Sequence, residues 1–487
     1  MKITATPLSL LLLLTLLLPP GPQSLSAQDY LSVEEQDPTL SIVLALQGIP
    51  TEFDVRNFKI RYTTQDAFGR PDTASGLISI PAGVSEPLPM TIYHHGTAGN
   101  RLAVPSVPGV QERILPAATA SNGYLTVAPD YIGLGDSDGL HPYVHRDSEA
   151  RAGRDLVLAA RRWFADQEIA QNGQLFTFGY SQGGHASMAL QRDLNLNPDP
   201  DLRLTAAAHL SGPYSISEIM VNTLFTDELV TLPGYIVYAY ISLNYVYQLF
   251  DDNGEIFVEP YVGLVDSFAG EDLSLDEFSF ALGRRLEARG ERIQDVLQDS
   301  ILAQLRANDP TTSRTIAALR LQDTYEFTPA APTLLAYCTR DEQVPFQNAL
   351  LADSVFRARG AADVRLFNGG ARDHGGCVFP AAQRTLAFFD EFAVRGPVTS
   401  LNGRPTPLHE LRPAPNPLRA GQPLRLPGLD EGAAYPFVLH DATGRVLRRG
   451  ALRGGRPLNT TGWPTGPLLL RLALPDGNFT ARRIIVR

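Results

Sequence analysis

A serine lies at the centre of a glycine-rich pentapeptide, Gly179-Tyr180-Ser181-Gln182-Gly183, which has the form Gly-x-Ser-x-Gly. The apolar residues 175–178 before it predict a strand, and residues 186–190 after it predict a helix. A serine on such a connection is a nucleophile elbow, whose strained turn exposes the hydroxyl to substrate. The backbone N–H of Gln182 begins the helix and can stabilise an oxyanion. Taken alone, the pentapeptide is also compatible with an ordinary tight turn.

An acid and a base follow two later predicted strands. Residues 332–337 predict a strand that leads to Asp341, and residues 364–367 predict one that leads to His374. The order Ser181, Asp341, His374 is that of the α/β-hydrolase triad and differs from the two other common triads. In this prediction the serine attacks a carbonyl carbon, the histidine transfers the proton, and the aspartate orients the imidazole.

Three neighbouring residues are alternatives for these roles. Glu342 or Asp373 could replace Asp341 as the acid. His185 is a poor alternative base, because it belongs to the predicted helix after the elbow and should point along that helix.

A second oxyanion donor is expected in the segment His94-His95-Gly96-Thr97-Ala98-Gly99, which follows a predicted strand at residues 89–93. A turn that contains glycine can hold a backbone N–H close to the serine. We predict that Thr97 supplies this N–H, with Gly96 as the alternative. A plain surface loop is the structural alternative.

The sequence contains two cysteines, and each is near one of these candidates. Cys338 lies three residues before Asp341, and Cys377 lies three residues after His374. If the acid and the base are in contact, the two sulfur atoms come close together. We therefore predict a Cys338–Cys377 disulfide, which suits an exported chain, with two buried free thiols as the alternative.

The elements around these residues alternate between strand and helix. This pattern predicts an α/β-hydrolase fold, with a mostly parallel sheet and helices on both faces. Residues 58–62 and 75–80 predict an antiparallel hairpin at the leading edge, and residues 28–53 have little pattern. The catalytic domain is expected to span residues 28–395.

The segment between the strand that ends at Leu210 and the strand at 332–337 is too long for a simple crossover. It predicts an inserted helical cap at about residues 213–331, above the strand ends where sites of α/β sheets lie. A tyrosine-rich stretch at residues 234–250 could line an acyl pocket or form the core of the cap itself.

The two ends of the chain differ from this region. Residues 1–27 predict a signal peptide, because Lys2 precedes a leucine-rich run and small residues follow it. No other stretch is long and apolar enough for a transmembrane segment in the mature protein. Residues 396–412 predict a linker, and residues 413–487 predict a small β-sandwich with turn residues between short apolar runs.

The composition limits the partners. The net charge of −11 argues against a nucleic acid partner. The charge is uneven, because residues 411–487 contain 12 arginines and 4 acidic residues, a surplus of +8 that leaves −19 on the remainder. No cofactor and no metal ligand set is predicted.

These motifs together resemble the secretory lipase family of α/β-hydrolases over roughly residues 55–395. The resemblance rests on the following segments: His94–Thr97, Pro129–Gly135, His141–Tyr143, Ser148–Ala150 and Gly179–His185. It implies hydrolysis of carboxylic esters, including acyl glycerols, beneath a helical cap. The cap matches least, so the resemblance does not indicate an acyl-chain length.

The C-terminal segment resembles the sorting domain of the type IX secretion system. The resemblance rests on Pro415-Asn416-Pro417, Asp441–Arg445 and Arg483–Arg487, although the usual aromatic residue after Gly466 is absent. It implies export to the cell surface or the medium, with the secretion machinery as a partner. A small domain that binds sugar or packs on the enzyme is the alternative.

The sequence therefore predicts an exported esterase or lipase that acts on a small-molecule or lipid ester through an acyl-enzyme. An exported serine peptidase of the aminopeptidase type, on the same fold, is the first alternative. A surface binding module with a vestigial elbow is the second, and the presence of Ser181, Asp341 and His374 argues against it.

Overall fold

The computed structural model describes the following residues: 29–46, 49–226, 232–394, 413–427, 429, 432–441, 446–473 and 479–487. The predicted signal peptide, the whole of the predicted linker segment and most of the Asp441–Arg445 motif lie outside them. Among the described helices, none combines the length and the apolar character needed to cross a bilayer.

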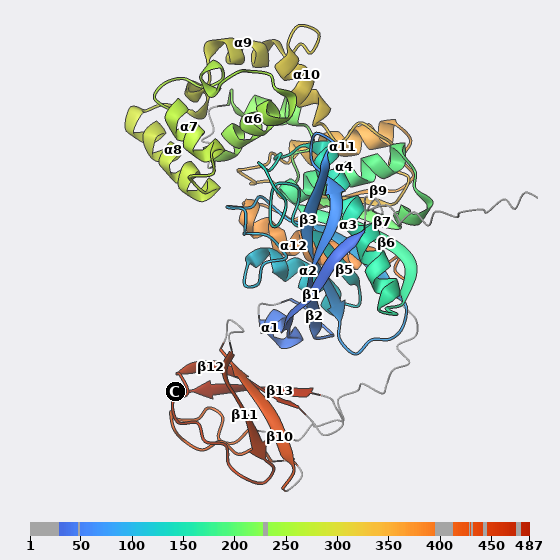
Figure 1. Cartoon of the computed structure of the whole chain (residues 1–487), viewed down its shortest axis with the longest axis vertical. Helices are drawn as coiled ribbons and strands as arrows, with labels where there is room; N and C mark the ends of the chain where they lie inside the picture. The colour runs from blue at the N-terminus through green and yellow to red at the C-terminus, as the bar shows by residue number, and fades with distance from the viewer. Residues whose placement is uncertain are drawn as a thin grey trace, which may run out of the picture.

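A nine-stranded sheet forms the centre of the larger unit (Figure 1). Its strand order is β1-β2-β3-β5-β4-β6-β7-β8-β9. The pairs from β1 to β5 are antiparallel, and all pairs from β5 to β9 are parallel. The strands are β1 (Tyr30–Thr39), β2 (Val55–Gln65), β3 (Pro71–Pro81), β4 (Leu88–His94), β5 (Leu125–Pro129), β6 (Gln171–Tyr180), β7 (Ala206–Leu210), β8 (Thr333–Tyr337) and β9 (Val364–Asn368).

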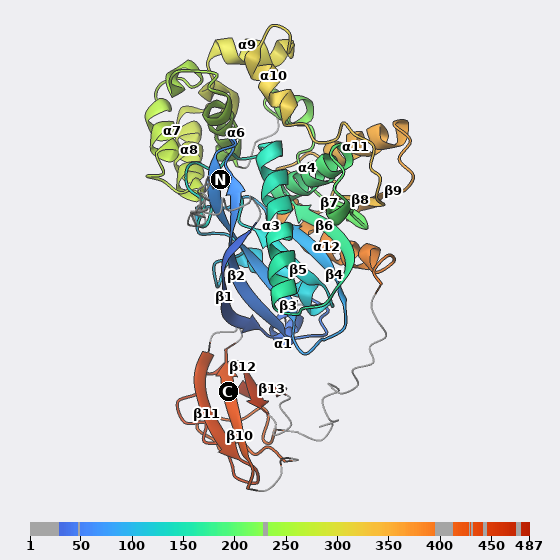
Figure 2. The ribbon, with the colours of Figure 1, turned by 45° about the vertical axis from the view of Figure 1, so that its right-hand side comes forward.

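Helices cover both faces of this sheet, as its buried apolar strands require. On one face, Leu156 of α3 and Leu190 of α4 pack in one cluster with strand residues, and α11 adds Phe356 beside α4 (Figure 2). On the other face, α2 and α12 pack against the strands. The helices are α1 (Ser41–Leu46), α2 (Ile114–Ser121), α3 (Arg146–Asp166), α4 (Gln182–Leu196), α11 (Gln347–Ala358) and α12 (His374–Phe389). The predicted α/β-hydrolase architecture is confirmed.

The N-terminal segment differs from the expectation that it has little pattern. Residues 30–39 form the edge strand β1, which pairs antiparallel with β2. All of its residues are exposed or half-buried. Backbone hydrogen bonds hold this strand in the sheet. Its sequence therefore needs no alternation of apolar and polar residues, which is the pattern by which a strand is predicted.

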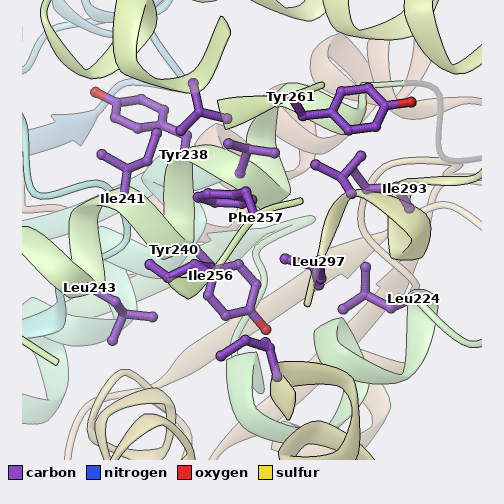
Figure 3. Packing of buried hydrophobic residues seen from close by; sticks show 14 of the residues in the cluster. Leu224, Tyr238, Tyr240, Ile241, Leu243, Ile256, Phe257, Tyr261, Ile293 and Leu297 are labelled. Atoms are coloured by element: carbon purple, nitrogen blue, oxygen red, sulfur yellow. The ribbon is translucent and has the colours of Figure 1, made fainter. Parts of the chain in front are cut away.

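Helices between β7 and β8 form a cap at one end of the sheet (Figure 1). They are α5 (Val221–Thr223), α6 (Pro233–Tyr247), α7 (Val262–Ala269), α8 (Leu275–Arg289), α9 (Asp299–Ala307) and α10 (Arg314–Leu321). The cap has an apolar cluster, which Tyr143 and Val144 join from the sheet unit, and in which Tyr238 and Tyr240 lie near Phe257 and Leu297 (Figure 3). Of the two roles considered for the tyrosine-rich stretch, the core of the cap therefore accounts for Tyr238 and Tyr240.

A separate antiparallel sheet lies at the C-terminal end of the chain, in the order β11-β10-β12-β13. Its strands are β10 (Ala434–His440), β11 (Val446–Arg453), β12 (Gly466–Ala473) and β13 (Phe479–Val486). One apolar cluster, which includes Trp463 and Leu470, lies against this sheet. The all-β character predicted for this segment is confirmed.

Candidate active site

Ser181 lies at the turn between β6 and α4 with φ 59° and ψ −123°. This backbone conformation is strained for a residue with a side chain, as expected of a nucleophile elbow. A Cβ at Gly179 would lie 2.1 Å from the carbonyl oxygen of Gly183, and one at Gly183 would lie 1.9 Å from that of His94. The two glycines of the pentapeptide are therefore required, because β4, β6 and α4 meet closely at this turn.

Asp341 and His374 are in direct contact. The two carboxylate oxygens of Asp341 lie 2.9 and 2.8 Å from Nδ1 of His374. Oδ1 of Asp341 also accepts hydrogen bonds from the backbone N–H of Gln343 at 3.1 Å and of Val344 at 2.9 Å. The carboxylate is thus held in one orientation, with its side chain 1% exposed.

His374 is also connected to the elbow through the residue before Ser181. The hydroxyl of Tyr180 donates to the carbonyl oxygen of His374 at 2.6 Å, and the two rings lie 5.0 Å apart. His374 is the first residue of α12. Since Nδ1 faces Asp341, the other ring nitrogen, Nε2, remains for proton transfer.

The two alternative acids have other partners. Glu342 accepts a hydrogen bond from the backbone N–H of His374 at 3.0 Å. Asp373 is the N-cap of α12 and accepts from the backbone N–H of Gly376 at 2.7 Å. Both carboxylates orient the backbone that carries the histidine, while Asp341 contacts its imidazole.

A disulfide joins Cys338 to Cys377, with the Cα atoms 6.0 Å apart. This is the predicted pairing. Both cysteines are fully buried in the apolar cluster that includes Phe178 and Phe388. The bond connects the segment that leads to Asp341 with the first turn of α12.

The segment after β4 lies against the elbow. A Cβ at Gly96 would lie 3.7 Å from the carbonyl oxygen of Tyr180. The backbone N–H of Gly96 points to Oε2 of Glu112 at 3.4 Å, so this N–H has a partner already. Thr97 anchors its side chain through a 3.1 Å hydrogen bond between its Oγ1 and the hydroxyl of Tyr143.

The same segment also contacts the cap. The backbone N–H of Leu275, at the start of α8, donates to the carbonyl oxygen of Gly99 at 2.8 Å. Arg101 forms an ion pair of 2.7 Å with Glu271. Tyr143 stacks on Tyr238 of the cap with the ring centroids 4.6 Å apart. The expected oxyanion segment is therefore part of the boundary between sheet and cap.

A buried polar network lies beneath the elbow helix. Both oxygens of Glu149 are used, because Oε1 accepts from Nε2 of Gln182 at 2.9 Å and Oε2 lies 2.6 Å from Nδ1 of His185. Nε2 of His141 lies 2.8 Å from the Gln182 side chain. These four side chains are almost completely buried. His185 is thus paired within the core, consistent with its rejection as the base.

Sequence reasoning did not assign a role to Glu149 or His141, although both fall in the segments that carry the family resemblance. Glu149 lies in the first turn of α3, where an acidic residue is common for its interaction with the helix dipole, so its position in the sequence gives no signal of its partners. Burial lowers the pKa of His141 to about 3, so this ring is neutral at pH 7 and can accept a hydrogen bond from Gln182.

The profile of the secretory lipase family matches residues 106–395. The chain belongs to the secretory lipase family. No curated protein matches the chain significantly.

Solved structures of esterases and lipases share the fold of this family member. A Legionella pneumophila protein described as a candidate hydrolase is 27% identical to this chain, with a TM-score of 0.67. The match covers 74% of this chain and 98% of the Legionella chain. The rice cell wall degrading esterase LipA from Xanthomonas oryzae is 26% identical to this chain, with a TM-score of 0.64. The match covers 75% of this chain and 98% of the LipA chain.

Candida antarctica lipase A in its closed state is 15% identical to this chain, with a TM-score of 0.57, and the match covers 77% of this chain and 86% of the lipase chain. At this identity the likeness supports the fold alone. Together with the family, these neighbours identify the chain as a carboxylic ester hydrolase.

Proposed function

We propose that the chain hydrolyses carboxylic esters through a triad of Ser181, His374 and Asp341. His374 takes the proton of the Ser181 hydroxyl through Nε2 as the oxygen attacks the ester carbonyl carbon. The same nitrogen then returns the proton to the departing alcohol. Asp341 fixes the tautomer with the proton on Nδ1 and stabilises the imidazolium. Water repeats these steps on the acyl-enzyme and releases the acid.

The tetrahedral oxyanion of both steps is bound by the backbone N–H groups of Gln182 and Thr97 in this proposal. Gln182 begins α4, so its N–H is one of the unpaired donors at a helix N-terminus. Its side chain is fixed by Glu149, which keeps the first turn of the helix in place. The N–H of Gly96 already faces Glu112, which favours Thr97 over Gly96.

The observation that carries the proposal is the contact of both Asp341 oxygens with Nδ1 of His374, together with a serine in a strained turn whose preceding residue, Tyr180, hydrogen-bonds to His374. A purely structural ion pair gives no reason for a serine with a positive φ at the neighbouring turn between β6 and α4. Esters are favoured over peptides as substrates because the chain belongs to the secretory lipase family and is 26% identical to an esterase.

A fluorophosphonate probe tests the serine directly. We expect labelling of the wild type and of Ser32→Ala, an exposed serine on β1, and no labelling of Ser181→Ala. Hydrolysis of p-nitrophenyl esters of rising chain length, measured beside aminoacyl anilides, tests the substrate class. Labelling of Ser181→Ala at the wild-type rate, or hydrolysis of the anilides alone, would contradict the proposal.

We further propose that residues 413–487 direct the chain to a type IX secretion system. Two parts of the motif that supports this meet in space, because Asn416 donates to the carbonyl oxygen of Arg483 and accepts from the N–H of Ile485, each at 2.8 Å. The disulfide and the family support export more generally. In a host with this system, a chain without residues 413–487 should remain in the periplasm. Release of that chain into the medium at wild-type levels refutes the assignment.

A further inference from the structure

A groove lined by arginines runs between α3 and α4, two helices that lie side by side on one face of the sheet (Figure 2). Its volume is about 500 Å³. It is separate from the elbow, because Ala189, the first lining residue of α4, is eight residues beyond Ser181, or about 12 Å along the helix. The basic residues in its wall are Arg146, Arg151, Arg154 and Arg192.

Only part of this positive charge is compensated inside the groove. Arg146 forms an ion pair of 3.0 Å with Asp147, whose side chain is 63% exposed and therefore well solvated. Arg154 forms a longer one of 3.4 Å with Asp193. The remaining acidic residue of the wall, Asp155, accepts a 2.7 Å hydrogen bond from Thr64 on the neighbouring strand.

The other two arginines have no carboxylate partner among the described residues. Arg151 donates from Nη1 to the backbone carbonyl of Asp66 at 2.8 Å, which leaves its charge unbalanced. Arg192 forms no ion pair in the described part of the chain. Four guanidinium groups therefore face three carboxylates, and each guanidinium has five N–H donors.

Two of these donors are buried without a partner. Within the described residues, the Nε atoms of Arg154 and Arg192 have no hydrogen-bond acceptor. Burial, and then the nearby charge of Arg146, lower the pKa of Arg192, while the charges of Asp147, Glu326 and Asp193 act more weakly in the opposite direction. Unpaired buried donors and neighbouring like charges both raise the free energy of the folded protein. A bound anion relieves both.

We infer that this groove binds a phosphate group of a small molecule or a lipid headgroup. The planar guanidinium fork matches phosphate oxygens with two parallel hydrogen bonds, and several arginines together suit a dianion. The volume of about 500 Å³ lies within the range of small-molecule sites, roughly 300–1,000 Å³. The whole chain carries a net charge of −11, so attraction of an anion must arise locally.

Calorimetric titration of the full chain with inorganic pyrophosphate tests this inference. We expect binding that weakens as salt increases, because charged contacts are screened. The variant Arg151→Gln/Arg192→Gln should bind at least about 10-fold more weakly. Its matched control is Arg284→Gln/Arg285→Gln, which removes two exposed arginines of α8 and should bind like the wild type. Circular dichroism and thermal unfolding verify that both variants are folded.

Vesicles of phosphatidylcholine with and without phosphatidic acid distinguish the two sources of phosphate. A lipid headgroup is assigned if the wild type sediments with the phosphatidic acid vesicles, if pyrophosphate prevents this sedimentation, and if the groove variant does not sediment. Binding of pyrophosphate without sedimentation assigns a soluble phosphate ester. The inference is overturned if pyrophosphate does not bind to the wild type, or if it binds equally to the groove variant and to the control.

Discussion

Removal of the Cys338–Cys377 disulfide should lower both stability and turnover. The bond closes a loop of 39 residues. In the chain-entropy model, a cross-link over this length restricts the unfolded chain by about 4 kcal/mol. At an unfolding entropy of about 2.1 cal/mol/K per residue, a unit of roughly 370 residues loses about 5 °C in Tm. The value of kcat should fall a few-fold, because the bond also connects the Asp341 segment to the start of α12.

Differential scanning calorimetry and ester hydrolysis measure these two effects in Cys338→Ala, Cys377→Ala and the double variant. If the cross-link is the cause, either single variant shows nearly the full loss of Tm, and the double variant adds little. Reduced wild type should behave in the same way. Single-variant losses that add up in the double variant would refute the reasoning, because they would arise from the packing of each buried sulfur.

Four further predictions concern the elbow, the triad and the buried polar groups. Asp341→Asn should lower kcat at neutral pH by about 10³- to 10⁴-fold, because an amide favours the wrong tautomer of His374; a change in KM alone would contradict this. Gly183→Ala should abolish activity and lower Tm, since its Cβ would lie 1.9 Å from a carbonyl oxygen, whereas Gly263→Ala, with no atom within 4 Å, should have little effect on either. Glu149→Gln leaves His185 without its carboxylate and should cost about 3–5 kcal/mol in urea unfolding, with the exposed Glu287→Gln as the neutral control. Acidification from pH 7 to pH 5 should lower the free energy of unfolding by about 2 kcal/mol for each deeply buried histidine. The reason is that each such histidine binds a proton near pH 6.5 in the unfolded chain but stays neutral in the folded chain. A free energy of unfolding that stays constant over this range would contradict neutral buried rings. Burial lowers the pKa to about 3 for His94, His141 and His209.

The parts of this protein that depend on local pattern are predictable from the sequence. The apolar strand before Ser181, the glycines around it and the chain order of the acid and the base led to the sheet and to the contact between Asp341 and His374. The disulfide followed from that contact, because each cysteine is three residues from a partner.

Features that depend on distant neighbours were not predictable. The strand β1 is held by backbone hydrogen bonds along an exposed edge, and its side chains carry little signal. The partnership of Glu149 with Gln182 and His185 joins two helices that pack together only in the folded chain. Whether a tyrosine of the cap lines a pocket or fills a core depends on which side of its helix is covered, and α6 is apolar on most sides.

If the proposed triad is correct, its order in the chain determines when the protein can become active during biosynthesis. Ser181 and the Thr97 segment precede the cap, whereas Asp341, His374 and both cysteines follow it. A chain still emerging from the ribosome or a translocation pore therefore carries a nucleophile without its base until more than three quarters of its length is available. Both cysteines are close to the proposed base, so formation of the disulfide and assembly of the proposed triad depend on the same late segment of the chain. Under the proposed mechanism, an incomplete chain is therefore inactive.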